Sequence, residues 1–133
     1  MRPLLLSAVL MWLVLPGCAD VDRDLPRPYR SVEVPDRRIA SVDARMRGGR
    51  LFGEYCALCH GERGDGRGVR REGLTRPPRD FTNPSWRQST SPRHVFYAIR
   101  EGLADTPMPN WKALSEQDAW DMTAYVLTLS DQR

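Results

Sequence analysis

The sequence has little of several features that mark common classes of protein. Three cysteines among 133 residues are too few, and of the wrong parity, for a scaffold held by several disulfides. No apolar run approaches the roughly 20 residues that a membrane-spanning helix needs. Lys112 is the single lysine, and 19 arginines leave a formal net charge of only +3. That excess is too small to indicate nucleic-acid binding.

The N-terminus has the pattern of an export signal. Arg2 precedes an apolar run over residues 4–15 that only Ser7 interrupts. The run is too short to cross a bilayer, but it has the length of the apolar part of a signal peptide. Residues 1–17 are therefore predicted to be a signal peptide, and the mature protein is predicted to be exported.

A cysteine follows this signal directly. The sequence Leu15-Pro16-Gly17-Cys18 resembles the lipobox of bacterial lipoproteins, in which the cysteine carries the lipid and becomes the new N-terminus. The resemblance implies lipidation of Cys18 and a membrane-anchored protein on the periplasmic side. Gly17-Cys18-Ala19 also fits ordinary cleavage by signal peptidase, which would leave a soluble periplasmic protein. Lipidation is favoured because a free thiol is a liability in an oxidising compartment.

Residues 18–45 are predicted to be the lipid-anchored N-terminus and a flexible linker. From residue 19 onward this segment balances six arginines against six acidic residues, contains three prolines and shows no apolar period. Such a composition is typical of a solvated tether. The alternative is that residues 29–34 pack as an edge strand on the domain formed by residues 46–133.

That domain is predicted to be all-α, with about three main helices and long loops. The first helix follows Asp43 as N-cap; the second begins at Ser91 and Pro92 and ends at Gly102. The third begins at Ser115, with an acidic residue three positions on as in a capping box. One face of the first helix would carry Ala44, Gly48, Phe52, Tyr55, Cys56 and Cys59, and the third would bury Ala119, Met122, Val126 and Leu129.

One short motif predicts a cofactor site: Cys56-Ala57-Leu58-Cys59-His60. C-x-x-C-H is the attachment signature of c-type haem. On a helix, the spacing places both thiols and the imidazole on one side. Cys56 and Cys59 are therefore predicted to bind one haem c covalently, and His60 is predicted to reach its iron. A thioredoxin-like dithiol, a zinc site completed by His94 and a structural Cys56–Cys59 disulfide are the alternatives, and each lacks part of its usual setting.

Met108 is the candidate for the second axial ligand of the iron. It lies in Thr106-Pro107-Met108-Pro109, where each proline forces the residue before it into extended backbone. Such a stiff segment can hold a thioether at a fixed distance. Met46 and Met122 are instead expected to serve packing, and His94 is expected to be a solvated or capping side chain.

In combination, these motifs resemble those of a class I monohaem cytochrome c over residues 44–133. The resemblance implies that Gly48 and Phe52 let the first helix cross the last one closely, against Tyr125. It also implies the cytochrome c fold around one haem c, with Cys56, Cys59, His60 and Met108 as the haem-binding residues. A proline carbonyl, from Pro77 or Pro78, is expected to orient the His60 ring.

The function expected from this resemblance is electron transfer. A membrane-tethered monohaem cytochrome would pass single electrons between redox partners outside the cytoplasm, such as a membrane respiratory or dehydrogenase complex, and would not itself be an enzyme. The alternative is a haem-dependent peroxidase or gas sensor, which needs an open iron site and a polar side chain such as His94 or Arg93 near it.

The loop after His60 is rich in glycine and arginine. Its glycines are expected to form turns, because no strand precedes the run as a phosphate-binding loop would require. Two interpretations of its arginines stay open: a basic rim that attracts an acidic redox partner, or a solvated loop. These arginines are Arg63, Arg67, Arg70, Arg71, Arg76 and Arg79.

Overall fold

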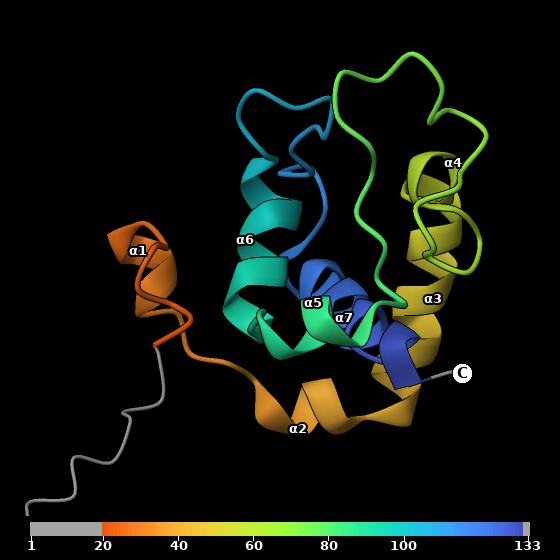
Figure 1. Cartoon of the computed structure of the whole chain (residues 1–133). Coiled ribbons are helices and arrows are strands. Elements are labelled where there is room, and N and C mark those ends of the chain that lie inside the picture. The colour runs from red at the N-terminus through yellow and green to blue at the C-terminus, as the bar shows by residue number, and fades with distance from the viewer. Residues whose placement is uncertain (1–19, 132–133) are drawn as a thin grey trace, which may run out of the picture.

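A computed structural model of the chain describes residues 20–131, so the predicted signal peptide and Cys18 lie outside the described residues. Over this range the fold consists of helices and loops without a strand, which confirms the all-α prediction (Figure 1). The helices are α1 (Arg27–Arg30), α2 (Asp36–Ala40), α3 (Val42–Tyr55), α4 (Ala57–His60), α5 (Pro84–Gln88), α6 (Pro92–Glu101), α7 (Glu116–Val126) and the 3-10 helix η1 (Leu129–Asp131). None of these helices is long and apolar enough to cross a bilayer.

The three longest helices are the three that the sequence predicts, and two have the expected caps. Ser91 caps α6 by accepting from the His94 N–H at 3.2 Å, and Ser115 caps α7 by accepting from Asp118 N–H at 3.0 Å. The prediction of Asp43 as the cap of α3 is wrong. Ser41 takes that place with extended backbone and accepts from Ala44 N–H at 3.3 Å, while Asp43 lies within the first turn.

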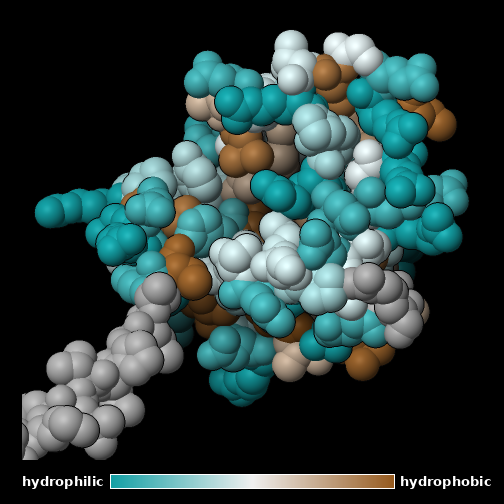
Figure 2. Space-filling view, viewed as in Figure 1, coloured by the Kyte–Doolittle hydropathy of each residue, from teal (hydrophilic) through white to brown (hydrophobic). Residues whose placement is uncertain are grey.

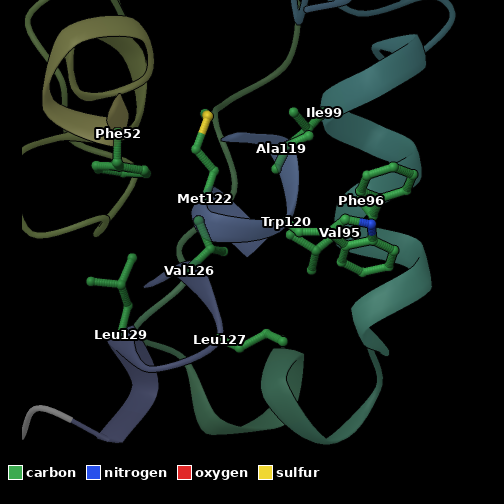
Figure 3. Packing of buried hydrophobic residues seen from close by; sticks show 10 residues of the cluster. All are labelled: Phe52, Val95, Phe96, Ile99, Ala119, Trp120, Met122, Val126, Leu127 and Leu129. Atoms are coloured by element: carbon green, nitrogen blue, oxygen red, sulfur yellow. The ribbon is translucent and has the colours of Figure 1, made fainter. Parts of the chain in front are cut away.

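The core forms where α7 packs against α3 on one side and α6 on the other (Figure 3). Phe96 of α6 stacks on Trp120 of α7 with ring centroids 4.0 Å apart. Phe52 of α3 packs on Tyr125 of α7 at 5.3 Å between ring centroids. The buried cluster comprises Phe52, Val95, Phe96, Ile99, Ala119, Trp120, Met122, Val126, Leu127 and Leu129.

Gly48 sets the distance between α3 and α7. A Cβ added to Gly48 would lie 1.9 Å from the backbone oxygen of Asp121 and 2.9 Å from Cβ of Tyr125. No residue with a side chain fits there unless the helices move apart. The close crossing expected at Gly48 is therefore present, and it fixes the end of α3 from which the C-x-x-C-H segment continues.

The expectation of a flexible segment before the domain is wrong for residues 20–45. Leu25 is 3% exposed, and α1 lies against α6 while α2 lies against α7. Asp22 is buried and accepts a hydrogen bond from Arg93 at 2.9 Å. The packing anticipated for residues 29–34 exists, but as helix and coil rather than as a strand. These contacts join residues about 70 positions apart, so a local pattern of charge and proline does not reveal them.

Candidate functional site

The turn from α3 into α4 brings Cys56, Cys59 and His60 together. Cys56 lies between the two helices, and its backbone oxygen accepts from Cys59 N–H at 3.1 Å and from His60 N–H at 2.9 Å. This hydrogen bonding produces the i, i+3, i+4 arrangement expected from the sequence. Both thiols are free and half-buried.

The glycine-rich loop folds back over the same segment. Gly66 N–H donates to the His60 oxygen at 2.8 Å, and Gly68 N–H donates to the Cys59 oxygen at 3.1 Å. A Cβ at Gly68 would lie 2.3 Å from the Leu58 oxygen, so the loop touches the motif's backbone. The loop makes turns, as expected, and holds the motif in place.

The His60 ring is oriented by residues from a third part of the chain. Its Nδ1 lies 3.1 Å from the backbone oxygen of Arg79, and its ring stacks on Phe81 with centroids 4.6 Å apart. The expectation that Pro77 or Pro78 supplies this carbonyl is wrong. The Pro78 oxygen faces Gly66 instead, where an added Cβ would lie 2.8 Å from it.

This contact settles the tautomer of His60. A carbonyl oxygen only accepts, so Nδ1 carries a proton, and in the neutral ring Nε2 keeps its lone pair. Burial lowers the pKa of His60 below its ordinary value, although the hydrogen bond to Arg79 acts in the opposite direction. At neutral pH the ring is therefore neutral, which is the form that binds a metal.

The Cys56 thiol is also neutral at physiological pH. Burial, and then the proximity of Cys59, raise the pKa of Cys56 to about 12. Two free thiols beside a neutral imidazole with an available Nε2 are the donor set that covalent attachment of a c-type haem requires. The residues present therefore fit this group.

Arg79 and Phe81 are site residues that the sequence analysis missed. The sequence Asn83-Pro84 that follows them is a typical helix start. In the structure Asn83 caps α5 by accepting from Ser85 N–H at 2.9 Å, and Pro84 occupies the first helical position. That signal marks the end of the loop, but it does not show which carbonyl reaches His60.

Met108 lies in the loop that joins α6 to α7, which is directed to the same end of the molecule as α4 (Figure 1). Met108 is partly buried. Met122 is fully buried in the core, as expected. The expectation of a packing role for Met46 is wrong, because Met46 is 61% exposed on α3.

His94 and Arg93 are engaged elsewhere. His94 Nδ1 lies 3.3 Å from an Asp22 carboxylate oxygen, and Arg93 binds the other oxygen at 2.9 Å. Both residues belong to the first turn of α6, whereas the loop that carries Met108 follows its last turn. The polar side chains considered for an open iron site thus hold the N-terminal segment to α6.

The arginines of the loop after His60 are all exposed. Arg63 pairs with Asp65 at 3.3 Å, and its side chain remains 85% exposed. Trp86 and Trp111 pack on aromatic rings: Trp86 on Phe81 at 4.9 Å, and Trp111 on Tyr55 at 5.2 Å between centroids. The loop therefore presents its positive charge to solvent.

The fold and the site together define the class of protein. Helices α3 and α7 cross closely, and a C-x-x-C-H segment with an oriented histidine follows the first of them. This is the all-α cytochrome c fold. The chain belongs to the family described as cytochrome C oxidase, cbb3-type, subunit III, whose model matches residues 43–126. Membership of this cytochrome c family implies haem c as the cofactor.

A solved structure supports the same assignment. The Kuenenia stuttgartiensis reducing HAO-like protein complex Kustc0457/Kustc0458 contains a chain that is 29% identical, with a TM-score of 0.60. The similarity covers 67% of this protein but only 44% of that chain, so this protein spans less than half of its length. None of the curated proteins compared with the sequence matches it.

Proposed function

We propose that this protein is a membrane-tethered monohaem cytochrome c that passes single electrons between redox proteins outside the cytoplasm. In this proposal Cys56 and Cys59 would hold the haem covalently, and His60 and Met108 would bind its iron. The observation that carries the proposal is the hydrogen bond from His60 Nδ1 to the Arg79 oxygen, which leaves Nε2 free beside two thiols. When bound, the haem supplies a one-electron iron couple.

The chain's own residues make this site stiff. The Arg79 oxygen and the Phe81 ring hold the His60 imidazole in one tautomer and one orientation. Gly66 and Gly68 fasten the backbone of the motif from the other side. A site that does not rearrange when the iron changes charge is what an electron carrier needs.

The proposed arrangement in the cell follows from the N-terminus. Residues 1–17 would be removed, and Cys18 would carry the lipid that tethers the domain to the membrane on its periplasmic side. A tether raises the effective concentration of the domain at a neighbouring membrane complex. The exposed arginines of the loop after His60 would favour an acidic partner surface. A respiratory or dehydrogenase complex is the proposed partner, in line with the oxidase-subunit description of the family.

Two matched variants test the proposal in a host that attaches haem c. In the Cys56→Ala/Cys59→Ala variant, haem should be lost from the protein on acid extraction, whereas in the Cys18→Ser variant it should stay bound. Cys18→Ser should instead move the exported protein from the membrane to the soluble fraction. Haem that acid extracts from the unaltered protein would refute covalent attachment, and a Cys18→Ser protein that stays on the membrane would refute the lipid anchor.

A further inference from the structure

The loop that carries Met108 is fastened to the end of α6 by its backbone. We call residues 103–114 the Met108 loop. Its first residue, Leu103, donates its N–H to the Met108 oxygen at 3.3 Å, and Trp111 N–H donates to the Ile99 oxygen at 2.9 Å. Gly102, at φ +70°, leads into the loop, and a Cβ there would lie 2.7 Å from the Met108 oxygen. Met108 therefore depends on the last turn of α6 for its position.

Glu101, the last residue of α6, joins this loop to a second segment of the chain. One of its carboxylate oxygens binds Lys112 Nζ of the Met108 loop at 2.7 Å. The other accepts a hydrogen bond from the hydroxyl of Tyr29 in α1. The hydrogen bond from Lys112, followed by that from Tyr29, lowers the pKa of Glu101, so the bridge holds an ionised carboxylate.

Tyr29 is itself held in place by aromatic contacts. Its ring packs edge-on against Tyr97 with centroids 4.9 Å apart, and it also contacts Phe96 at 6.2 Å. Tyr29, Glu101 and Met108 line one surface groove of about 520 Å³. Hydrophobic residues lie at the junction between the N-terminal segment and α6 (Figure 2).

The segment that carries Tyr29 has further attachments to α6. Arg93 binds Asp22 at 2.9 Å and donates to the Val32 oxygen at 2.8 Å. Both contacts lie at the start of α6, whereas Tyr29 reaches its end. The chain between residue 20 and α2 is thus bound along the helix. Among the hydrogen bonds and ion pairs of residues 20–35, the one between Tyr29 and Glu101 reaches the end of α6 from which the Met108 loop continues.

We infer that Tyr29 is a positioning residue for Met108, acting through Glu101 and Lys112. The segment between the proposed lipid anchor and the domain would then be coupled to ligation of the iron. The inference rests on the proposed function, because it requires Met108 to be an axial ligand. Surface loops such as the Met108 loop open with a low free-energy cost, so a small loss of stabilisation raises the population of the open form. A hydrogen bond to a charged group is strong enough to change that population by about tenfold.

Imidazole binding to the oxidised haem-loaded protein tests this inference. External imidazole reaches the iron only when the sulfur of Met108 leaves, so its apparent affinity reports the open population of the loop. Tyr29→Phe keeps the ring and removes the hydroxyl. We expect it to bind imidazole about tenfold more tightly than the unaltered protein. Lys112→Gln should change the affinity in the same direction.

Tyr97→Phe is the matched control. Tyr97 lines the same groove and packs on Tyr29, but no hydrogen bond involves its hydroxyl among residues 20–131. Tyr97→Phe should leave the imidazole affinity within twofold of the unaltered value. An imidazole affinity of Tyr29→Phe equal to that of the unaltered protein would overturn the inference, whether or not Lys112→Gln changes it.

The methionine–iron charge-transfer band of the unaltered protein tests Met108 as a ligand separately from the role of Tyr29. If the band is present and Tyr29→Phe shifts the imidazole affinity, the inference is supported. If the band is present and the affinity does not shift, only the positioning role of Tyr29 is refuted. If the band is absent, Met108 is not a ligand, and both the axial assignment and the inference are overturned.

Discussion

The backbone of Gly48 lies so close to Asp121 that a Cβ added to the glycine would be 1.9 Å from the Asp121 oxygen. This contact brings α3 onto α7 and fixes where α3 ends and the C-x-x-C-H segment begins. Helix packing at this distance tolerates no side chain, so the crossing should be the most sensitive point of the fold.

Substitution of Gly48 should therefore destabilise the protein. We expect Gly48→Ala to lower the free energy of unfolding by about 3 kcal/mol, because the helices must separate. Gly53→Ala on the same helix is the control. Apart from Gly53 itself, its chain neighbours and the nearby helix backbone, no atom lies within 4 Å of a Cβ built at Gly53, so alanine should raise the unfolding free energy by about 0.5–1 kcal/mol through its helix propensity. Denaturant unfolding of both variants measures the difference, and equal losses would contradict the close crossing.

Asp121 of α7 also holds α2 in place. Its carboxylate, 1% exposed, binds Arg38 of α2 at 2.6 Å and Arg47 of α3 at 2.7 Å. Asp121→Asn keeps the shape of the side chain but removes its charge, which leaves both guanidinium groups without their anion. We expect a loss of about 2 kcal/mol in the free energy of unfolding. Arg47→Gln should cost less, because Arg38 remains paired; an equal or larger loss would mean that Asp121 is not the shared centre.

The attachment of the N-terminal segment to α6 should be lost at acid pH. Burial alone would raise the pKa of Asp22, but hydrogen bonds from Ser91 and Arg93 and the charges of Arg93 and His94 hold it below its ordinary 3.8. Because the folded pKa is depressed, the stabilisation is complete above pH 3.8. It is lost as the pH falls through the folded pKa.

NMR chemical shifts of residues 20–34, followed as the pH is lowered, provide the measurement. The methyl shifts of Leu25, which is 3% exposed, should keep their neutral-pH values above pH 3.8 and move toward those of an unpacked side chain as the pH falls further. Asp22→Asn should show the acid-type shifts already at neutral pH. Neutral-pH shifts in Asp22→Asn that match the unaltered protein would contradict the anchoring role of Asp22.

Met108 and Met46 form a matched pair of methionines. Met108 is partly buried in the loop after α6, whereas Met46 is 61% exposed on α3. We expect Met108→Ala to lower the reduction potential of the haem and to let carbon monoxide bind the reduced iron, because thioether ligation favours the reduced state. Met46→Ala should change neither property. An unchanged potential in Met108→Ala would remove Met108 from the ligand set.

The parts of the fold that the sequence predicts are those encoded locally. Ser91 and Ser115 act within three residues of their own positions, and the C-x-x-C-H segment holds both thiols and the imidazole within five. Each can be read without knowledge of the rest of the chain. The all-α class and the three main helices follow from the same kind of local pattern.

The parts that could not be predicted depend on contacts between distant residues. Arg79 orients His60 through its backbone, and any residue type carries a backbone carbonyl, so no side-chain pattern marks it. In the sequence, nothing distinguishes Asp22 from the other acidic residues of the predicted linker. Its partner Arg93 lies 71 positions later, and the two meet only in the folded protein. Tyr29 meets Glu101 at a similar separation of 72 residues. Such pairs appear only when the helices have been packed.

Absorption spectroscopy of protein made in a host that attaches haem c tests whether His60 and Met108 together close the iron site. Spectra of the oxidised protein, the reduced protein and the reduced protein with carbon monoxide are compared. We predict a c-type reduced spectrum, a methionine–iron charge-transfer band in the oxidised protein and no response to carbon monoxide. A covalently bound haem that readily binds carbon monoxide would contradict the closed His60/Met108 site and place the protein among haem enzymes or gas sensors.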